Sequence, residues 1–154
     1  MEVLLMMIRS SDQYIECMAD NQRIALPIHA VQEIIRFELF NPTPQLDPQV
    51  LGTISWYGRT LPVVRLQPNS NDNDSADFAK SCMTARILIL RQHNQAILGL
   101  YVDRVCRIAT HPQHLWTATS TYPWITRYLE QDYTHISLLD IESLNYAFGL
   151  TATR

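Results

Sequence analysis

The sequence predicts a mostly β, barrel-like fold, and three observations support this class. Short runs of β-branched and aliphatic residues recur along the 154-residue chain, separated by turn-forming Gly, Pro, Asn and Asp. Only a segment near the C-terminus combines helical spacing with helix-capping residues. No glycine-rich phosphate loop is present in the sequence. Many short strands with little helix are typical of barrels and sandwiches.

The first predicted elements form a hairpin. Strands are expected at 14–18 and 23–27, because apolar residues fill both runs and Asp20-Asn21 between them suits a tight turn. The next segment, IHAVQEIIRF, fits either helical or strand spacing. We predict one helical turn at 28–31 and a strand at 33–37, followed by a loop that contains three prolines.

The stretch LGTISWYGRTLPVVRL predicts a second hairpin. Its strands should cover 53–56 and 60–66, and Gly58 should lie in the turn that joins them. The polar segment 67–80 then follows. It is expected to be a flexible surface loop, which divides the chain into two halves of similar length.

The second half begins with three predicted strands, at 86–91, 96–102 and 105–108. Their nearly continuous aliphatic character indicates burial on both faces. The stretch 109–132 contains two prolines and is expected to be irregular. A strand at 135–139 should then lead into the C-terminal helix.

The C-terminal helix has clear sequence signals at both ends. Asp140 is placed to cap its N-terminus, and Gly149 is placed to end it. The spacing of Ile141, Leu144 and Phe148 predicts a buried face.

The composition argues against several kinds of partner. The formal net charge is −3, and the 12 basic residues form no stripe that could neutralise phosphates or an anionic membrane. The three cysteines form no C-x-x-C pair, which is typical of a reducing compartment and predicts a cytoplasmic protein. The apolar N-terminus lacks a basic region and a cleavage site, so we expect it to dock onto the domain without membrane insertion.

Several residues were considered as parts of an enzyme or metal site. His111 and His114 follow Cys106 at irregular spacing on a proline-containing loop, which favours solvated histidines over a metal site. His29 is expected to be half-buried and hydrogen-bonded. Asp103 ends a predicted strand, where a turn-capping role is favoured over acid–base chemistry. We therefore expect no catalytic residue, metal or cofactor, and a small metal-dependent hydrolase remains the enzyme alternative.

Aromatic and arginine side chains are the remaining candidates for contacts with a partner, since both are enriched at interface hot spots. For Trp116 and Trp124, core packing is as good an interpretation as contact. Tyr57 and Arg59 flank a glycine turn and are expected to be exposed. The full set is Trp56, Tyr57, Arg59, Trp116, Trp124 and Tyr128.

Five features in this order resemble the CheW-like domain of bacterial chemotaxis coupling proteins: AVQEII, the loop that contains three prolines, LGTISWYGRTLPVVRL, LGLYVDRV and ISLLDIESL. The resemblance covers residues 12–150 as a single domain. It implies two SH3-like five-stranded β-barrels packed on a shared hydrophobic core, with short helices that include the C-terminal one. Such a fold agrees with the many short strands expected from the residues alone.

The resemblance implies a non-catalytic scaffold or adaptor. CheW-like proteins couple the cytoplasmic tips of methyl-accepting chemoreceptors to the regulatory domain of a CheA-type histidine kinase, in chemotaxis or in type IV pilus signalling. The receptor tip would bind as a helix in a groove at the barrel junction. The alternative is a divergent regulatory module that no longer binds the kinase and binds another protein. The implied partner-binding residues are Val31, Glu33, Gly52, Trp56, Tyr57, Gly58, Arg59, Val102 and Asp103.

The chain departs from the family pattern at two positions. Where the family has an arginine in an N-L-R-G turn, this chain has Tyr57, and where the family has the aspartate of P-V-I-D-L, it has Arg65. The family arginine lies close to a glutamate that corresponds to Glu33. We therefore predict that Arg59 replaces the missing cation beside Glu33, since side chains two apart on a strand share a face.

Overall fold

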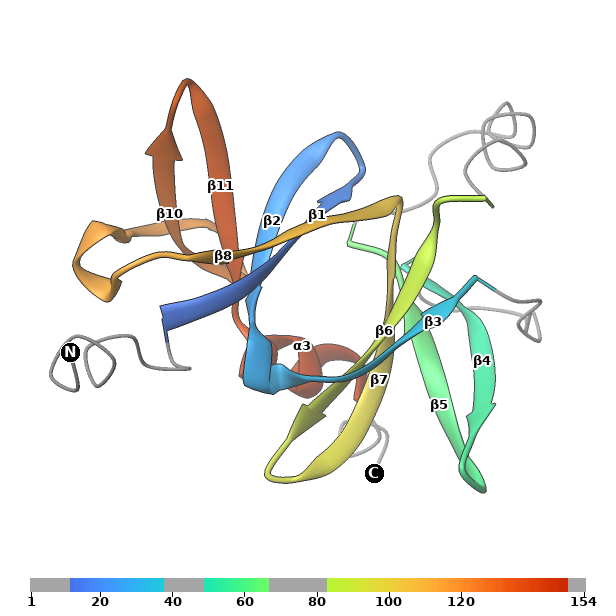
Figure 1. Cartoon of the computed structure of the whole chain (residues 1–154). Coiled ribbons are helices and arrows are strands. Elements are labelled where there is room, and N and C mark those ends of the chain that lie inside the picture. Colours follow the sequence, from blue (N-terminus) through green and yellow to red (C-terminus); the bar gives the residue numbers. More distant parts are fainter. Residues whose placement is uncertain (1–11, 38–48, 67–82, 150–154) are drawn as a thin grey trace, which may run out of the picture.

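The computed structural model describes residues 12–37, 49–66 and 83–149, and these residues form two β-sheets and one α-helix (Figure 1). One sheet, the terminal sheet, contains six strands in the order β8-β1-β2-β11-β10-β9. Its strands are β1 (Gln13–Ala19), β2 (Gln22–Pro27), β8 (Arg104–Thr110), β9 (Thr117–Tyr122), β10 (Ile125–Gln131) and β11 (Thr134–Leu139).

The other sheet, the central sheet, contains five strands in the order β3-β6-β7-β5-β4. Its strands are β3 (Val31–Arg36), β4 (Val50–Trp56), β5 (Arg59–Val64), β6 (Arg86–Gln92) and β7 (Gln95–Val102). Short 3-10 turns η2 (Ile28–Ala30) and η3 (Gln113–Leu115) precede β3 and β9, and α3 (Ile141–Phe148) follows β11. The fold is thus mostly β with a C-terminal helix, as predicted.

The two sheets do not correspond to the two halves of the sequence. The central sheet is made from the middle of the chain, whereas the terminal sheet combines the first hairpin with the last four strands, because β8 pairs with β1 and β11 pairs with β2. The polar segment 67–80, which was predicted to separate the two halves of the sequence, lies outside the described residues; along the chain it falls between β5 and β6, which belong to the same sheet. The terminal sheet also has six strands where the resemblance implied five.

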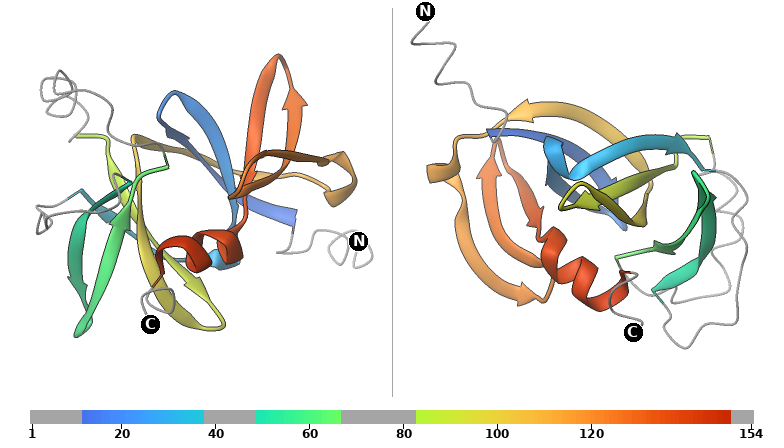
Figure 2. Two further views of the ribbon diagram at one scale, coloured as in Figure 1. Left: turned by 180° about the vertical axis from the view of Figure 1, so that it is seen from behind. Right: turned by 90° about the horizontal axis from the view of Figure 1, so that it is seen from below.

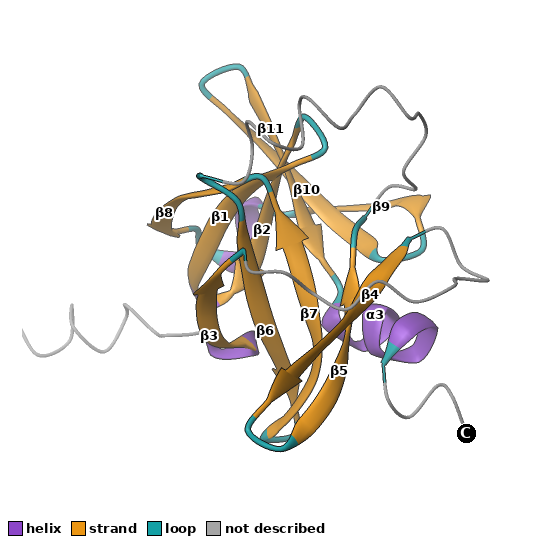
Figure 3. Ribbon diagram, turned by 90° about the vertical axis from the view of Figure 1, so that its right-hand side faces the viewer, coloured by secondary structure: helices purple, strands orange, loops and turns teal. Residues whose placement is uncertain are grey.

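Among the described residues, four hairpin turns have two consecutive residues with positive φ, the conformation of type I′ turns (Figure 3). The turns at Asp20-Asn21, at Tyr57-Gly58 and in QHNQ (His93-Asn94) lie where the sequence predicts them. The fourth, Asp132-Tyr133, joins β10 to β11 and was not predicted. This backbone matches the twist of the adjacent strands, so each turn fixes the register of its hairpin.

Strands β9 and β10 correct the prediction that 109–132 is irregular. Apolar alternation is weak in this stretch, because β9 is rich in threonine and a bulge interrupts the pairing of β10 between Ile125 and Arg127. Only Ile125 and Leu129 of β10 are buried. Threonine favours strands for steric reasons that apolar periodicity does not capture.

Buried side chains form three clusters that follow strand alternation. In β1, Ile15 and Cys17 belong to the core shared by the two sheets, whereas Tyr14 points into the terminal sheet's own core. In β6, Leu88 belongs to the shared core and Ile87 to the central sheet's core. Burial on both faces of β6 and β7 is thereby confirmed, since nearly all their middle residues are buried.

The C-terminal helix closes the shared core, and Figure 2 shows it at the junction of the sheets. Leu144 and Phe148 are buried and Ile141 is half-buried, which confirms the predicted face. Asp140 occupies the N-cap position, but its carboxylate accepts a hydrogen bond from the Ser143 hydroxyl at 2.6 Å instead of from a backbone N–H. No helix in the described ranges is long and apolar enough to cross a bilayer.

Candidate protein-docking site

Four of the predicted contact residues, Trp56, Tyr57, Gly58 and Arg59, form the turn between β4 and β5, called the β4–β5 turn (residues 56–59). Trp56 and Arg59 are directly opposed in the strand register, so Tyr57 and Gly58 form the tip. Tyr57 has φ +46° and is 82% exposed, as predicted. Gly58 has φ +75°, and no atom lies within 4 Å of the position that a Cβ would take. The tip therefore projects into solvent.

Trp56 connects this tip to β3. Its ring packs edge-on against the ring of Tyr57, with centroids 4.7 Å apart. Its indole Nε1 donates a hydrogen bond of 2.8 Å to Oε2 of Glu33. Because β3 and β4 are the two edges of the central sheet, this bond joins the edges through side chains. The half-buried Trp56 also packs against the central sheet's own core.

The predicted Glu33–Arg59 ion pair is wrong, since none of the ion pairs among the described residues joins these two side chains. The prediction assumed that residues 57 and 59 alternate as on a strand. Tyr57 and Gly58 instead have left-handed backbone conformations, which break that alternation. Glu33 accepts its hydrogen bond from Trp56 in place of a cation.

Three other predicted contact residues offer little side chain to a partner. Val102 is fully buried in the shared core, and Gly52 is buried opposite Val63. Neither residue therefore presents a side chain at the surface in this conformation. Val31 is half-buried at the start of β3 and packs against the shared core, so part of its surface faces outward.

Asp103 has the turn-capping role that the sequence favoured. Its Oδ2 accepts a 2.9 Å hydrogen bond from the backbone N–H of Asp20, in the turn between β1 and β2. Burial raises the pKa of Asp103, and repulsion from the nearby Asp20 carboxylate also raises it. The hydrogen bond from the Asp20 backbone lowers the pKa but does not offset these two effects. Asp103 therefore belongs to the sheet junction and not to the β4–β5 turn.

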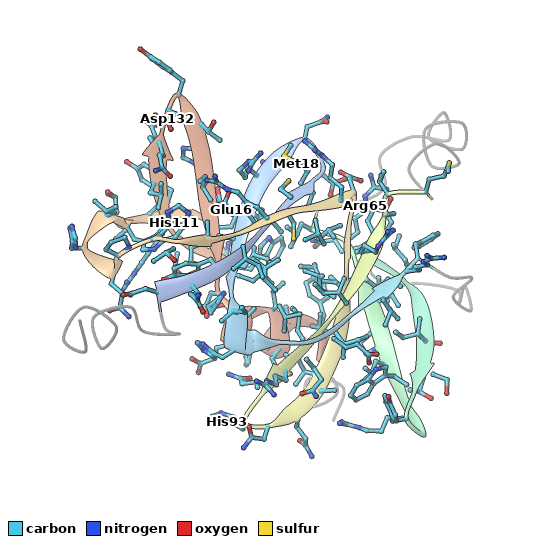
Figure 4. The ribbon with its side chains drawn as sticks, in the orientation of Figure 1. Glu16, Met18, Arg65, His93, His111 and Asp132 are labelled. Carbon is cyan, nitrogen blue, oxygen red and sulfur yellow. The ribbon has the colours of Figure 1, made fainter. Side chains whose placement is uncertain are left out.

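Arg65 completes this junction and was not predicted as a site residue. It follows β5 at the end opposite Arg59, and its Nη2 and Nε lie 2.7 and 2.8 Å from Oδ1 of Asp20. Its guanidinium also lies 5.6 Å from the ring centroid of Tyr101, in a cation–π contact. Figure 4 shows Arg65 beside the β1–β2 hairpin. We call Asp20, Arg65, Tyr101 and Asp103 the Arg65 cluster; it fastens the terminal sheet to the central sheet.

A second ionic cluster lies inside the terminal sheet around Glu16, which is fully buried. Glu16 accepts hydrogen bonds from Arg23 at 2.9 Å and Arg107 at 3.2 Å, and lies 2.6 Å from Nε2 of His111 (Figure 4). Burial alone would raise the pKa of Glu16, but these hydrogen bonds outweigh it and hold the pKa below its usual value. No sequence motif distinguishes Glu16, because two of its three partners, Arg107 and His111, lie 91 and 95 positions away along the chain.

The histidines differ from their predicted environments. His111 is 2% exposed against Glu16, so its interpretation as a solvated loop histidine is wrong, whereas His114 is exposed as predicted. His29 was expected to be half-buried, but its side chain is exposed. Within the described ranges, no three His, Cys, Asp or Glu side chains are grouped to hold a metal ion.

The remaining aromatic and cysteine side chains mostly stabilise the fold. Trp116 is buried beside Tyr14, and Trp124 packs against Phe148, which settles both tryptophans as packing residues. Tyr128 is half-buried and stacks on His135. Cys17 is buried, and burial raises its pKa to about 12.

A groove of about 610 Å³ lies at the junction of the two sheets. Its walls are η2, the β6–β7 turn, β10, the end of β11 and the start of α3. The residues that line it are Pro27, His29, Ala30, Arg91, Gln92, His93, Asn94, Thr126, Arg127, Leu138, Leu139, Asp140, Ile141 and Glu142.

Comparison with known proteins identifies the family. A family model described as the CheW-like domain matches residues 13–147, almost the whole described chain. The chain belongs to the CheW-like family. The crystal structure of the scaffolding protein TtCheW from Thermoanaerobacter tengcongensis is similar to it, with a TM-score of 0.66, 16% sequence identity and 84% of each chain covered. Among curated proteins, no sequence matched this chain.

Proposed function

We propose that this CheW-like chain is a non-catalytic adaptor that couples chemoreceptors to a CheA-type histidine kinase, in chemotaxis or type IV pilus signalling. The observation that carries the proposal is the match to the CheW-like domain across residues 13–147. The similarity in fold to a chemotaxis scaffolding protein supports it. We place the adaptor in the cytoplasm and treat residues 12–150 as one domain.

Two surfaces are suited to two partners. The projecting β4–β5 turn, with Tyr57 and Arg59, has the residue types of an interface hot spot and is assigned to the kinase regulatory domain. The groove at the junction of the sheets is concave, contacts both sheets and is assigned to the helical receptor tip.

The residues required by the hydrolase alternative are engaged in different parts of the fold. Asp103 caps the β1–β2 turn, and His111 is buried against Glu16. His114 is exposed on η3. Asp103, His111 and His114 therefore do not face one common site, as a hydrolase would require. This arrangement favours an adaptor over an enzyme.

One observation favours the second candidate, a regulatory module that has lost kinase binding. Tyr57 replaces the family arginine at the β4–β5 turn, and Trp56 has taken its place beside Glu33.

A pull-down from native cell extract with the tagged chain, followed by identification of the captured proteins, separates the two. Recovery of both a kinase and a receptor supports the adaptor. Recovery of a receptor or another protein without the kinase would favour the regulatory module. If the purified kinase regulatory domain also fails to bind the chain, the adaptor function is overturned.

A further inference from the structure

We infer that residues 1–8 of this chain dock across the open side of the shared core and cover an apolar rim on the edge strands β3 and β8. The apolar rim consists of Ile28, Val31, Ile34, Val105 and Ile108. This contact lies within one chain, so the inference does not depend on the proposed adaptor function.

On the central sheet, the apolar rim lies on β3 and on η2 before it. Val31 is directly opposite Leu90 of β6. Ile34 is directly opposite Leu88, and both leucines are fully buried in the shared core. Directly opposed side chains of antiparallel strands lie on the same face of the sheet. The face that forms the shared core therefore continues across β3, where Ile34 is 42% exposed at the sheet edge.

On the terminal sheet, the apolar rim lies on β8. Ile108 is directly opposite Ile15, and Val105 is directly opposite Cys17. Ile15 and Cys17 are both buried in the shared core, yet Ile108 is 61% exposed. Figure 1 shows β3 and β8 on the same side of the molecule, the side that faces the viewer.

The shared core is closed on one side and open on the other. Helix α3 packs on the shared core, and the right-hand view of Figure 2 shows it on the side opposite β3 and β8. Among the described residues, no element gives the apolar rim a comparable cover, since Ile34 and Ile108 are both exposed. An exposed apolar surface that continues a buried core marks a contact site.

The segment that precedes β1 fits the apolar rim by composition and by position. Its first eight residues, MEVLLMMI, are apolar except for Glu2. The segment joins the described chain at Asp12, whose backbone oxygen accepts a 2.8 Å hydrogen bond from the N–H of His111, just beyond the end of β8. It therefore enters the fold beside the strand that carries Ile108.

The length of the segment is sufficient to reach both sides of the apolar rim. Strand β1 contacts both β8 and η2, so the two sides are one strand apart. Eleven extended residues span about 36 Å, which far exceeds the spacing of about 5 Å between neighbouring strands. A segment tethered so closely has a high effective concentration at the rim, which favours it over a second copy of the chain.

The other segments outside the described ranges fit the apolar rim less well. Residues 67–82 and 150–154 are mostly polar, and residues 38–48 are interrupted by three prolines.

The contact has a consequence for binding, and this consequence does rest on the proposed function. Val31 is one of the partner-binding residues that the family resemblance implies, and it belongs to the apolar rim. The docked segment therefore covers it, and a partner that binds at Val31 has to displace the segment.

Methyl NMR on the full chain tests the contact directly. With labelled isoleucine, leucine, valine and methionine methyl groups, residues 3–8 should show NOE cross-peaks to Ile34 or Ile108. Absence of cross-peaks from the segment to any residue of the apolar rim overturns the inference. Cross-peaks that arise only between differently labelled molecules in a mixed sample assign the rim to a second copy and also overturn it.

Melting temperatures give an independent readout. Ile108→Ser should lower the melting temperature of the full chain by about 4 °C or more, but that of a chain without residues 1–9 by less than about 2 °C. The matched control is Tyr146→Ser on α3, which removes another exposed apolar side chain outside the apolar rim and should have the same effect in both chains.

A full-length variant with Leu4, Leu5 and Met6 all changed to serine replaces the shortened chain if that chain does not fold. If Ile108→Ser lowers the melting temperature equally with and without the apolar segment, the segment does not contact Ile108 and the inference is wrong.

Discussion

Tyr57 and Arg65 both stand where the CheW-like family has another residue, but the structure uses them in different ways. Tyr57 lies at an exposed hairpin tip, where its ring packs against that of its neighbour Trp56. Arg65 is 17% exposed and joins two sheets through Asp20 and Tyr101. A substitution at an exposed tip changes the surface that a partner contacts. A substitution at a sheet junction must instead be compatible with the buried residues around it. Restoring the family residue at each position should therefore have very different effects.

The largest expected effect is that of Arg65→Asp. The substitution would place a third carboxylate beside Asp20 and Asp103 and remove the cation that pairs with Asp20. Breaking a buried ion pair typically costs about 3–5 kcal/mol. We expect a loss of about that size in the free energy of unfolding, measured by urea denaturation. A loss below about 1 kcal/mol would show that the Arg65 cluster does not fasten the sheets.

The Glu16 cluster should dominate the response to acid. Because the pKa of Glu16 is lower in the folded chain than its ordinary value of 4.5, its contribution to stability is complete above that value. It is lost as the pH falls through the lower, folded-state pKa. The pKa of Asp103 is raised in the folded chain, so its effect on the pH dependence of stability has the opposite sign to that of Glu16.

Denaturation of the unmodified chain and of Glu16→Gln between pH 7 and pH 3 checks this. The variant should be less stable at neutral pH and should lose less additional stability in acid. Parallel curves for the two proteins would contradict the assignment of the acid response to Glu16.

Gly58→Val should have an intermediate effect. No atom opposes a side chain at this position, so the penalty comes only from the left-handed backbone at φ +75°. For a β-branched residue we expect a loss of roughly 1–3 kcal/mol. Gly58→Asn is the control, since asparagine tolerates this conformation, and its melting temperature should lie close to that of the unmodified chain. If Gly58→Val and Gly58→Asn lose equal stability, the penalty does not come from the left-handed backbone, and this explanation is wrong.

Asp103→Asn should change stability by less than about 1 kcal/mol, since the amide oxygen can still accept the hydrogen bond from Asp20 and repulsion between two carboxylates is relieved. Thermal denaturation at pH 7 is sufficient to measure it. A large loss would mean that the charge of Asp103, and not only its acceptor oxygen, stabilises the junction.

Local features of the fold were predictable from the sequence. Hairpin turns, the face of α3 and double-sided burial of β6 and β7 all depend on neighbouring residues, and the structure confirms them. The composition of the sheets was not predictable, because β8 pairs with β1 across most of the chain. Strand β9 was missed because threonine, and not apolar alternation, favours it.

The candidate site divides in the same way. The exposure of Tyr57 followed from its place beside a glycine turn. The partner of Glu33 did not, because a left-handed turn removes the alternation on which the prediction depended. The two ionic clusters join residues far apart in sequence, 45 positions for Arg65 with Asp20 and 95 for His111 with Glu16. The substitution of the family aspartate by Arg65 was the one signal that could have indicated such a cluster.

The most direct measurement compares Tyr57→Arg with Arg65→Asp, each restoring the family residue, for both melting temperature and affinity for the kinase regulatory domain. Tyr57→Arg should leave the melting temperature within about 2–4 °C, the change expected for about 1 kcal/mol in a chain of this size, and should weaken binding at least tenfold. Arg65→Asp should lower the melting temperature by several times that amount. If Tyr57→Arg binds the kinase domain as tightly as the unmodified chain, or if it melts as early as Arg65→Asp, the division between a docking tip and a sheet junction is wrong.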